Sequence, residues 1–499
     1  MLLGIDLGTS SVKALLLGRD GTVLGEASHA YPVRAPQPGW SETDPEDWWA
    51  AVVAAVRQAV GSCEAVGARQ AVAARQAGGS RQAVGAPGGA IQAIGLAGQM
   101  HGVVLTDAQG QALRPAVLWA DARTDRELEV YRSLPDAQRQ ALANPITVGM
   151  AGPSLLWLRE HEVANYGGAR WALQPKDWLR MRVTGEAATD PSDASATLLY
   201  DLQRDRWAAD VIELLGLRRD LLPPILDSAA AAGALSAAAA SALGLPKGVP
   251  VAVGASDTAA ANLGSGVVDD GDAQLVVGSG AQLMRITTTP KAAPELGLHV
   301  YRAAQPSTYY TMAAMQNAGL ALEWVLSVLG LTWDEAYALA ASAQPGCDGV
   351  SFLPYLVGER TPHLNPHSRG LWFGLQRQHT RAHLVRAALE GVAFAVRDGL
   401  QALQRAGVHP TTIRLAGGGT QRPFWRQLLA DTLRVPLQVS SVANASARGA
   451  AFLAALATGT PVHALPLAAS SASVEPNPLD DDLERAYLRF QDLYRRVFA

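Results

Sequence analysis

The feature that most constrains the fold is a short pattern that occurs twice, far apart in the chain. It consists of an apolar strand, a turn rich in glycine and hydroxyl residues, and a second apolar strand. The two copies comprise Leu2–Asp6, Gly8–Ser11 and Val12–Leu17, then Gln274–Val277, Gly278–Ala281 and Gln282–Thr287. The repetition indicates an internal duplication at the scale of a domain, with similar turns facing each other from two halves.

The length of the chain agrees with two halves. A chain of 499 residues is too long for one ordinary core and suits two domains, each able to bury a core of its own, with a cleft. Strand patterns are followed by helical ones, which predicts an α/β fold. Further strands are expected at Ile91–Ala97, Tyr309–Ala313 and Ile413–Ala416, and helices at Leu320–Leu329, Trp333–Ala343, Thr380–Leu403, Trp425–Leu433 and Leu483–Phe498.

Composition narrows the class of partner. The formal net charge of −4 and the 17% of charged residues give no basic stripe, so nucleic acid and membrane surfaces are not the expected partners. Cys63 and Cys347 have no CxxC companion and are expected to be ordinary thiols of a reducing cytosol. The N-terminus has no signal-peptide pattern, and the alanine-rich stretch 228–245 is expected to be a surface helix. We therefore expect a cytoplasmic protein with a small-molecule substrate.

One segment differs from the rest of the chain. A core-packing helix is expected from Pro45, because Asp44 can cap it and Trp48, Val52 and Val56 follow at helical spacing. Arg-Gln-Ala triplets then recur among glycine and alanine, and large apolar residues are almost absent. Such a stretch buries too little surface to offset the entropy of ordering it, so we expect a mobile low-complexity insertion at about residues 61–90.

Three glycine turns each follow a strand: Gly8–Ser10, Gly278–Gly280 and Gly417–Gly419. Glycine lets backbone N–H groups approach a phosphate, although any single turn is explained as well by ordinary turn chemistry. Three together, two of them at matching positions of the halves, favour phosphate binding. The chain has neither a Walker A motif nor a GxGxxG fingerprint, which leaves a nucleotide clamped between the two halves as the hypothesis.

Two carboxylates accompany these turns. Asp6 comes directly before the first turn and either caps it or binds a hydrated magnesium ion; an acid in an apolar strand is costly without a partner, which favours the metal. Asp257 follows the strand Val251–Val253 and Gly254, at a strand-to-helix corner. On that stretch alone, a helix cap is the better interpretation of Asp257 than catalysis.

Several motifs, in order along nearly the whole chain, resemble the FGGY family of carbohydrate kinases. They are Gly4–Lys13, Gly98–Gly102, Trp119 with Asp121 and Arg123, Phe352–His363 and Ala416–Thr420. The resemblance implies two ribonuclease-H-like domains of the actin, sugar kinase and Hsp70 ATPase type that flank a cleft, with MgATP between them. It implies an N-terminal domain over residues 1–255, with the sugar site, and a C-terminal nucleotide-binding domain over residues 256–499.

The resemblance also implies roles for individual residues. Asp257 would be the catalytic base. The sugar would contact Gln99, Met100, His101, Asp257 and Thr258; Asp6 would bind Mg²⁺ or its waters; ATP would contact Asp6, Thr9, Ser10, Lys13, Ser279, Gly280, Gly418 and Gly419. His101 is alternatively a structural turn residue. The chain departs from the family pattern at Thr258, Ser154, Ser279–Gln282 and Ser446–Ala451, which puts one sugar contact and the adenosine pocket in doubt.

The expected activity is ATP-dependent phosphorylation of a ketopentose, D-xylulose at its 5-hydroxyl, in pentose catabolism. A carboxylate that orients the attacking hydroxyl and accepts its proton suits this reaction. Two alternatives remain: a family member that acts on ribulose, gluconate or glycerol, and a non-catalytic sensor of the actin fold that binds sugar and nucleotide. A homodimer also remains open.

Overall fold

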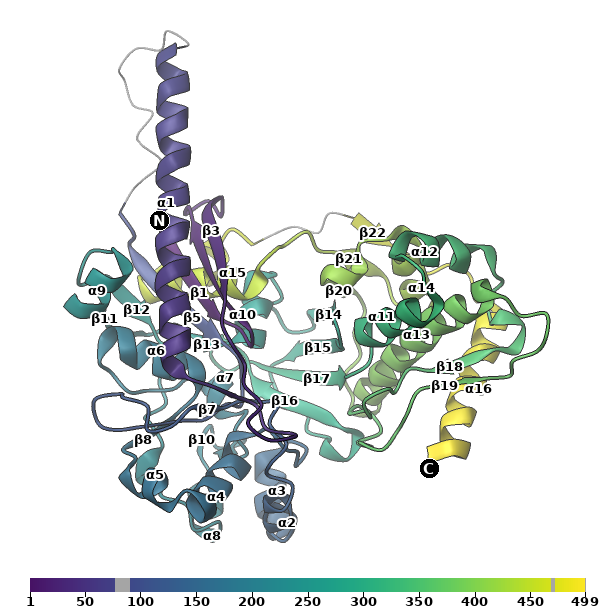
Figure 1. Cartoon of the computed structure of the whole chain (residues 1–499), viewed down its shortest axis with the longest axis horizontal. Helices are drawn as coiled ribbons and strands as arrows, with labels where there is room; N and C mark the ends of the chain where they lie inside the picture. The colour runs from purple at the N-terminus through teal and green to yellow at the C-terminus, as the bar shows by residue number, and fades with distance from the viewer. Residues whose placement is uncertain (77–89, 468–471, 499) are drawn as a thin grey trace. The chain divides into compact units, whose positions relative to one another are not determined.

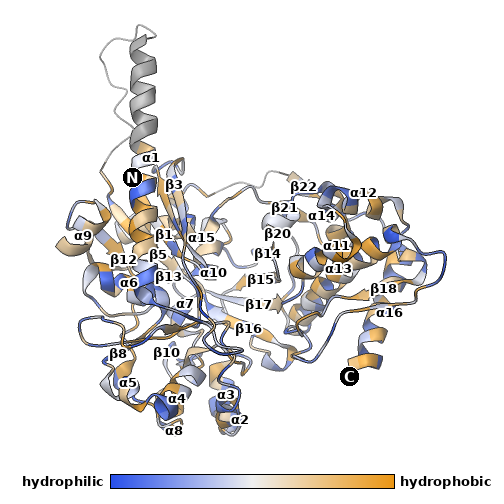
Figure 2. Ribbon diagram, viewed as in Figure 1, coloured by the Kyte–Doolittle hydropathy of each residue, from blue (hydrophilic) through white to orange (hydrophobic). Residues whose placement is uncertain are grey.

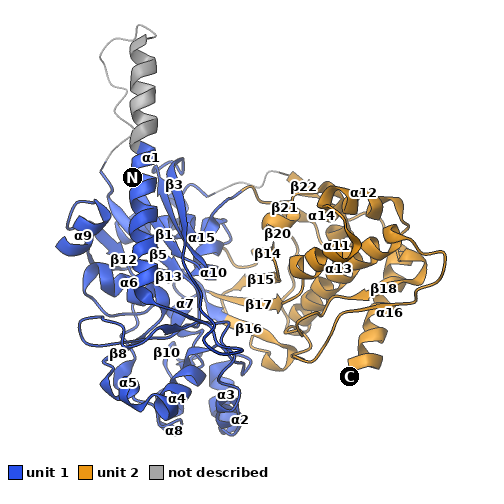
Figure 3. Ribbon diagram, viewed as in Figure 1, with its two compact units in different colours: residues 1–268, 301–308, 442–468 blue, residues 269–300, 309–441, 469–499 orange. Residues whose placement is uncertain are grey.

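The computed structural model describes residues 1–76, 90–467 and 472–498. The chain forms two compact units, coloured separately in Figure 3. Unit 1 comprises residues 1–268, 301–308 and 442–468, and unit 2 comprises residues 269–300, 309–441 and 469–499. Each unit therefore combines segments that are far apart in the sequence. The division of the sequence into domains after residue 255 stays a prediction.

Unit 1 is built on a mixed sheet in the order β11-β12-β5-β1-β2-β3, with the short strand β13 also paired to β5. The central strand β1 pairs antiparallel with β2 and parallel with β5, and β12 and β13 run parallel to β5. The strands are β1 Leu2–Leu7, β2 Ser11–Leu17, β3 Val23–Ala30, β5 Ala93–Gly98, β11 Ala231–Ala234, β12 Pro250–Ala252 and β13 Ala255–Ser256. The carboxyl ends of β1, β5 and β13 consequently meet at one edge of the sheet.

Shorter elements complete unit 1. The strands are β4 Glu42–Thr43, β6 Val104–Thr106, β7 Ala116–Val117, β8 Trp171–Leu173, β9 Tyr200–Asp201 and β10 Arg206–Trp207. The helices are α2 Glu127–Arg132, α3 Asp136–Leu142, α4 Ala151–His161, α5 Val163–Gly168, α6 Pro175–Thr184, α7 Pro191–Ala194, α8 Ala209–Leu214, α9 Ala237–Leu243, α10 Asp257–Gly264 and α15 Ala445–Ala457.

Helix α1, Pro45–Gln76, lies against β2 and β3, as Figure 1 shows. The side chains of Trp48, Val52 and Val56 are completely buried there, as their helical spacing predicted. The helix runs on to Gln76, so residues 61–76 of the predicted insertion are helical, while the mobility of the insertion stays a prediction. Alanine, arginine and glutamine are strong helix formers, and they extend a helix that is already nucleated at Pro45. The rest of the predicted insertion, residues 77–89, lies outside the described residues.

The alanine-rich stretch 228–245 is not the single surface helix that the sequence predicted. Its first part forms the edge strand β11, which pairs antiparallel with β12, and only its second part forms α9. Gly233 has a φ of +137°, and Ser236 accepts a hydrogen bond from the Ala239 N–H at the start of α9. The glycine and the serine therefore divide a run whose composition alone resembles one helix.

Helix α15 returns to unit 1 from the far end of the sequence and packs on β1, β5 and α10. The approach is so close that a Cβ at Gly95 would lie 1.7 Å from the carbonyl oxygen of Ala450. A Cβ at Gly449 would lie 1.8 Å from the carbonyl oxygen of Ala260. Only glycine fits at these two positions, so part of the predicted nucleotide motif near residue 449 also serves helix packing.

Unit 2 repeats the topology of the first sheet, in the order β16-β17-β15-β14-β20-β21-β22. Here β14 pairs antiparallel with β15 and parallel with β20, β20 is parallel to β21, and β21 is antiparallel to β22. This is the pairing that β1 makes with β2 and β5 in unit 1, so the predicted duplication is confirmed. The strands are β14 Ala273–Val277, β15 Ala281–Thr287, β16 Leu298–Arg302, β17 Tyr309–Met315, β18 Ser351–Leu353, β19 Leu371–Phe373, β20 Ile413–Ala416, β21 Leu437–Val439 and β22 Ala472–Val474.

The helices of unit 2 begin and end close to their predicted bounds. They are α11 Gly319–Leu329, α12 Trp333–Ser342, α13 Arg381–Arg405, α14 Pro423–Leu433 and α16 Asp481–Phe498. Helix α13 is central and mostly buried, whereas α16 carries apolar residues on one face and hydrophilic residues on the other, as Figure 2 shows. No helix among the described residues is long and apolar enough to span a membrane.

Candidate active site

Two carboxylates lie at the carboxyl edge of the unit 1 sheet. Asp6 is the penultimate residue of β1 and is opposite Ala97 of β5, while Ser256 is opposite Gly98. Asp257 follows Ser256 directly and is the first residue of α10. The two acids thus belong to the ends of parallel strands on either side of β5, the place where ligands bind in open α/β sheets.

Asp257 is held by the helix that it begins. The backbone N–H of Thr258 donates to its Oδ1 at 2.6 Å, and the hydroxyl of Thr258 donates to the same atom at 3.1 Å. No hydrogen bond reaches Oδ2 from the described residues, so this oxygen remains available to a ligand. Burial, followed by the negative charge of Asp6, raises the pKa of Asp257 to about 7. The hydrogen bonds from Thr258 lower the pKa, but by less than burial and Asp6 raise it. A carboxylate with a pKa near neutrality is suited to accept a proton.

Asp6 is 9% exposed, and its Oδ1 is a buried oxygen without a hydrogen-bond partner. Burial raises the pKa of Asp6, while the nearby Ser446 hydroxyl and the charge of Lys13 act in the opposite direction. An orphaned carboxylate oxygen beside a second acid is a poor arrangement for two anions and a good one for a hard cation with oxygen ligands. The residues present therefore fit a magnesium ion.

The first glycine turn is fixed by side chains from three other segments. Tyr31 and Gln99 both donate to the carbonyl of Gly8, Gln99 over 3.3 Å, and the indole N–H of Trp119 donates to Thr9 Oγ1 at 2.9 Å. These bonds orient the backbone between β1 and β2, where Ser10 is exposed and Lys13 is opposite Asp6. Gln99, predicted as a sugar contact, therefore also has a structural role in the turn.

His101 sits in a strained turn after β5. Its φ is +71°, and its Nδ1–H donates to the carbonyl of Ala196 over 2.7 Å. Its ring centroid lies 5.9 Å from that of Tyr301, and Met100 beside it is buried. A left-handed conformation is costly for a residue with a side chain and is found preferentially at functional sites. The structure places His101 at the same edge of the sheet as the two acids.

The glycine turns of unit 2 lie after two neighbouring parallel strands, β14 and β20. The carbonyl of Ser279 accepts backbone hydrogen bonds from Ala318 and Leu320 at the start of α11, at 3.0 and 2.9 Å. After β20, Gly417 has a φ of +100°, and a Cβ there would lie 2.3 Å from the carbonyl oxygen of Val277. Ser279 and Gly280 are thus brought to the same edge as Gly418 and Gly419, within unit 2.

A buried ionic cluster is connected to the Asp257 corner through Ser192, and the sequence did not predict it. Lys176 Nζ lies 2.6, 3.0 and 3.3 Å from carboxylate oxygens of Asp177, Asp190 and Asp193, and all four side chains are completely buried. Burial alone would lower the pKa of Lys176, but the three acids raise it. The sequence around these residues shows only helix-start patterns, such as Pro175 and Pro191, and gives no sign that the charges meet.

Glu359 has a structural environment that the sequence did not predict. It is 3% exposed and accepts the backbone N–H groups of Gln316 and Arg360, each at 2.7 Å. Burial raises its pKa to about 7. Its presence therefore has a structural explanation within unit 2.

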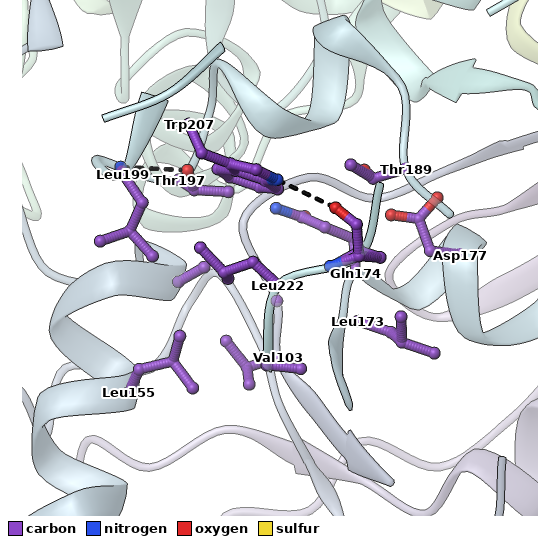
Figure 4. A pocket seen from close by; sticks show the side chains of 14 residues that line it. Val103, Leu155, Leu173, Gln174, Asp177, Thr189, Thr197, Leu199, Trp207 and Leu222 are labelled. Carbon is purple, nitrogen blue, oxygen red and sulfur yellow. Dashed lines mark hydrogen bonds between the residues drawn. The ribbon is translucent and has the colours of Figure 1, made fainter. Parts of the chain in front are cut away.

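A small apolar cavity in unit 1 is distinct from this edge. Figure 4 shows Val103, Leu155, Leu173, Leu222 and Trp207 around it, with the indole N–H of Trp207 bonded to the carbonyl of Pro223 at 2.9 Å. None of the predicted site residues is among those that line it. We interpret the cavity as a packing defect and not as a substrate site.

The comparisons with known proteins agree with the geometry. Residues 1–264 match the model of the FGGY carbohydrate kinase N-terminal domain, and residues 273–458 match the C-terminal domain. The chain belongs to the FGGY family of carbohydrate kinases. Membership implies a sugar and ATP as the substrates of a phosphoryl transfer.

Individual relatives cover the whole chain. The xylulose kinase of Escherichia coli (strain K12) is 35% identical over 100% of this chain and 98% of its own length. The structure of the xylulose kinase from Rhodospirillum rubrum superposes with a TM-score of 0.88 at 29% identity, over 99% of this chain and 98% of that one. The glycerol kinase of Dechloromonas aromatica is 32% identical over 92% of this chain and 89% of its own length.

Proposed function

We propose that this carbohydrate kinase transfers the γ-phosphoryl group of ATP to the 5-hydroxyl of D-xylulose, with Asp257 as the catalytic base. The observation that carries the chemistry is the position of Asp257, whose Oδ2 is unbonded among the described residues at the carboxyl edge of the sheet. The observation that favours the sugar is the full-length similarity to a protein named xylulose kinase.

In the proposed reaction, Asp257 accepts the proton of the sugar hydroxyl as the hydroxyl oxygen attacks the γ-phosphorus. The new P–O bond forms to the sugar, the bond between the γ-phosphorus and the bridging oxygen breaks, and ADP leaves. The pKa of Asp257, about 7, makes it a better base than an ordinary aspartate at neutral pH. Positioning of the hydroxyl and stabilisation of charge contribute most of the rate in phosphoryl transfer.

The remaining predicted residues supply that positioning. The backbone at Thr9 and Ser10, together with Lys13, would contact the transferring phosphate, and the turns at Ser279–Gly280 and Gly418–Gly419 would bind the rest of the nucleotide. Lys13 already interacts with Asp6, and its charge would be shared with the phosphate. His101, Met100, Gln99 and Thr258 would contact the sugar.

Magnesium is part of the proposal. Asp6 would bind the ion or its waters through the carboxylate whose Oδ1 has no hydrogen-bond partner in the described chain. The ion, when bound, neutralises charge on the phosphates. The nearby Ser446 hydroxyl would orient the Asp6 carboxylate by donating a hydrogen bond to it.

The experiment is a coupled assay of ADP release with D-xylulose, D-ribulose, D-gluconate and glycerol, each with MgATP. We expect the highest kcat/KM with D-xylulose. Preference for glycerol would favour the second activity found among relatives of similar identity. Binding of a sugar without any ADP release would instead support a non-catalytic sensor.

A further inference from the structure

A second group of potential ligand atoms lies in unit 1, away from the sheet edge. Glu127 is the first residue of α2, and Glu160 and His161 are the last two residues of α4. Each offers one ligand atom, a carboxylate oxygen or an imidazole nitrogen, and these atoms lie within 4.8 Å of one another. We call these three residues the α2–α4 cluster.

Glu127 is the member that requires an explanation. It is 5% exposed, and its Oε2 is buried without a hydrogen-bond partner among the described residues. A buried carboxylate oxygen that has lost its water without gaining a partner costs free energy. A bound cation would supply the missing partner.

His161 is oriented as metal-binding histidines are. Its Nδ1–H donates to the carbonyl of Trp157 over 3.0 Å, and its ring stacks on the Trp157 indole with centroids 4.6 Å apart. The lone pair of the neutral ring is therefore on Nε2. A backbone carbonyl that fixes one ring nitrogen while the other coordinates is the usual arrangement at metal sites.

We propose that the α2–α4 cluster binds one divalent transition-metal ion, with zinc as the best match. Imidazole nitrogen and carboxylate oxygen are both ligands that zinc accepts, and three protein ligands leave its fourth position open, whereas magnesium and calcium prefer oxygen ligands alone. Bonds of about 2.0–2.2 Å require donors roughly 3.4 Å apart. Glu160 can close that gap, because its side chain is 52% exposed and, among the described residues, it forms an ion pair only with Arg159, over 3.1 Å.

The bound ion would link two helices that already pack against each other, α2 and α4. None of its ligands belongs to the site proposed for phosphoryl transfer. The expected consequence is therefore greater stability of this part of unit 1, with no change in the chemistry of the kinase.

The test uses the full chain without an affinity tag, freed of metal with a chelator and dialysed against Zn²⁺. We expect one ion per chain and a higher Tm with Zn²⁺. Glu127→Gln and His161→Phe should each weaken binding by about tenfold or more, since loss of even an outer partner of a metal site costs about 10- to 100-fold. Phenylalanine keeps the ring that stacks on Trp157, and Co²⁺ should give a ligand-field spectrum that both variants lose.

The matched control is Glu129→Gln, on the same helix, because Glu129 is exposed and paired with Arg132. It should bind Zn²⁺ as the unmodified chain does. Kinase activity of every variant reports that the chain is folded. The proposal is overturned if the unmodified chain binds no Zn²⁺, or if folded Glu127→Gln and His161→Phe variants bind it as tightly as the control.

Discussion

The backbone N–H of Ser256, the residue before Asp257, donates a hydrogen bond of 2.8 Å to the hydroxyl of Ser192. The Ser192 hydroxyl in turn donates to Asp190 at 2.6 Å, and Asp190 lies 3.0 Å from Lys176. Ser256, Ser192, Asp190 and Lys176 are all completely buried. The strand-to-helix corner that carries the proposed base is thus anchored to a buried ionic cluster.

Removal of that anchor should affect catalysis more than binding. We expect Ser192→Ala to lower kcat by about 10- to 100-fold, because small displacements of a catalytic group are costly, while the affinity for ATP stays unchanged. Steady-state kinetics and nucleotide binding by calorimetry measure the two effects. Ser133→Ala is the control, since among the described residues the Ser133 hydroxyl bonds only to the carbonyl of Val130, on an exposed helix end. Equal effects of both substitutions would contradict the anchoring role.

The charge of Lys176 should be essential for stability. Lys176→Met removes the cation that lies between three buried acids, of which only Asp177 keeps another cationic partner, Arg180, among the described residues, so we expect a loss of about 3–5 kcal/mol in the free energy of unfolding. Burial raises the pKa of Asp193 well above its usual value, so the charge of this carboxylate is unfavourable where it lies, and Asp193→Asn, which removes that charge, should cost much less. Urea denaturation measures both values. The exposed Lys247→Met is the control. If Asp193→Asn is as damaging as Lys176→Met, the charge of Asp193 stabilises the cluster and this account of Asp193 is wrong.

The pH dependence of the kinase should follow Asp257. Because burial and Asp6 raise the pKa of Asp257 to about 7, this group is protonated, and inactive as a base, below that pH. We expect kcat/KM for the sugar to rise with pH and to level off above about 7. The measurement is a pH profile at low sugar concentration. A profile that is flat from pH 5 to 8 would contradict this assignment.

The stability of unit 2 should depend on pH through His363. Its ring stacks on Tyr494 with centroids 3.6 Å apart, and burial, followed by the charge of Arg405, lowers its pKa to about 4. Between about 4 and 6.5 the unfolded chain binds a proton that the folded chain does not, so stability falls as the pH decreases, by up to about 3 kcal/mol.

His363→Asn removes this proton difference. The variant should be less stable than the unmodified chain at pH 7, because it loses the stacked ring, but the difference should narrow at pH 5. Urea denaturation at both pH values measures it. A difference that widens at low pH would show that the ring is charged in the folded chain.

Local patterns in the sequence predicted most of the fold. Apolar strands bounded by glycine turns, such as β1 and β14, and helices with a regular apolar stripe, such as α13, were found because their signals lie within a few residues of each other. Composition alone was a poorer guide. The low-complexity composition beyond residue 61 did not reveal the helix α1, and the alanine-rich composition near residue 231 did not reveal the strand β11.

Long-range relationships could not be predicted from the sequence. The nearness of Ser446 to Asp6 depends on the return of α15 to unit 1, and the contact between Lys176 and Asp190 depends on two separate segments that meet inside unit 1. Local patterns showed Asp257 only as a corner residue, and its role as the base was implied by the family resemblance. Its pKa depends on burial and on Asp6, which no local pattern reports.

The central claim is that Asp257 accepts the proton of the sugar hydroxyl, and single-turnover transfer by Asp257→Asn tests it most directly. Asp44→Asn is the control, because Asp44 only caps the first turn of α1 through a 3.0 Å bond from the Glu46 N–H. We predict that Asp257→Asn lowers the rate of transfer from ATP to D-xylulose by about 10²- to 10⁴-fold with unchanged ATP affinity, while Asp44→Asn retains nearly full activity. Transfer by Asp257→Asn within a few-fold of the control would contradict the account.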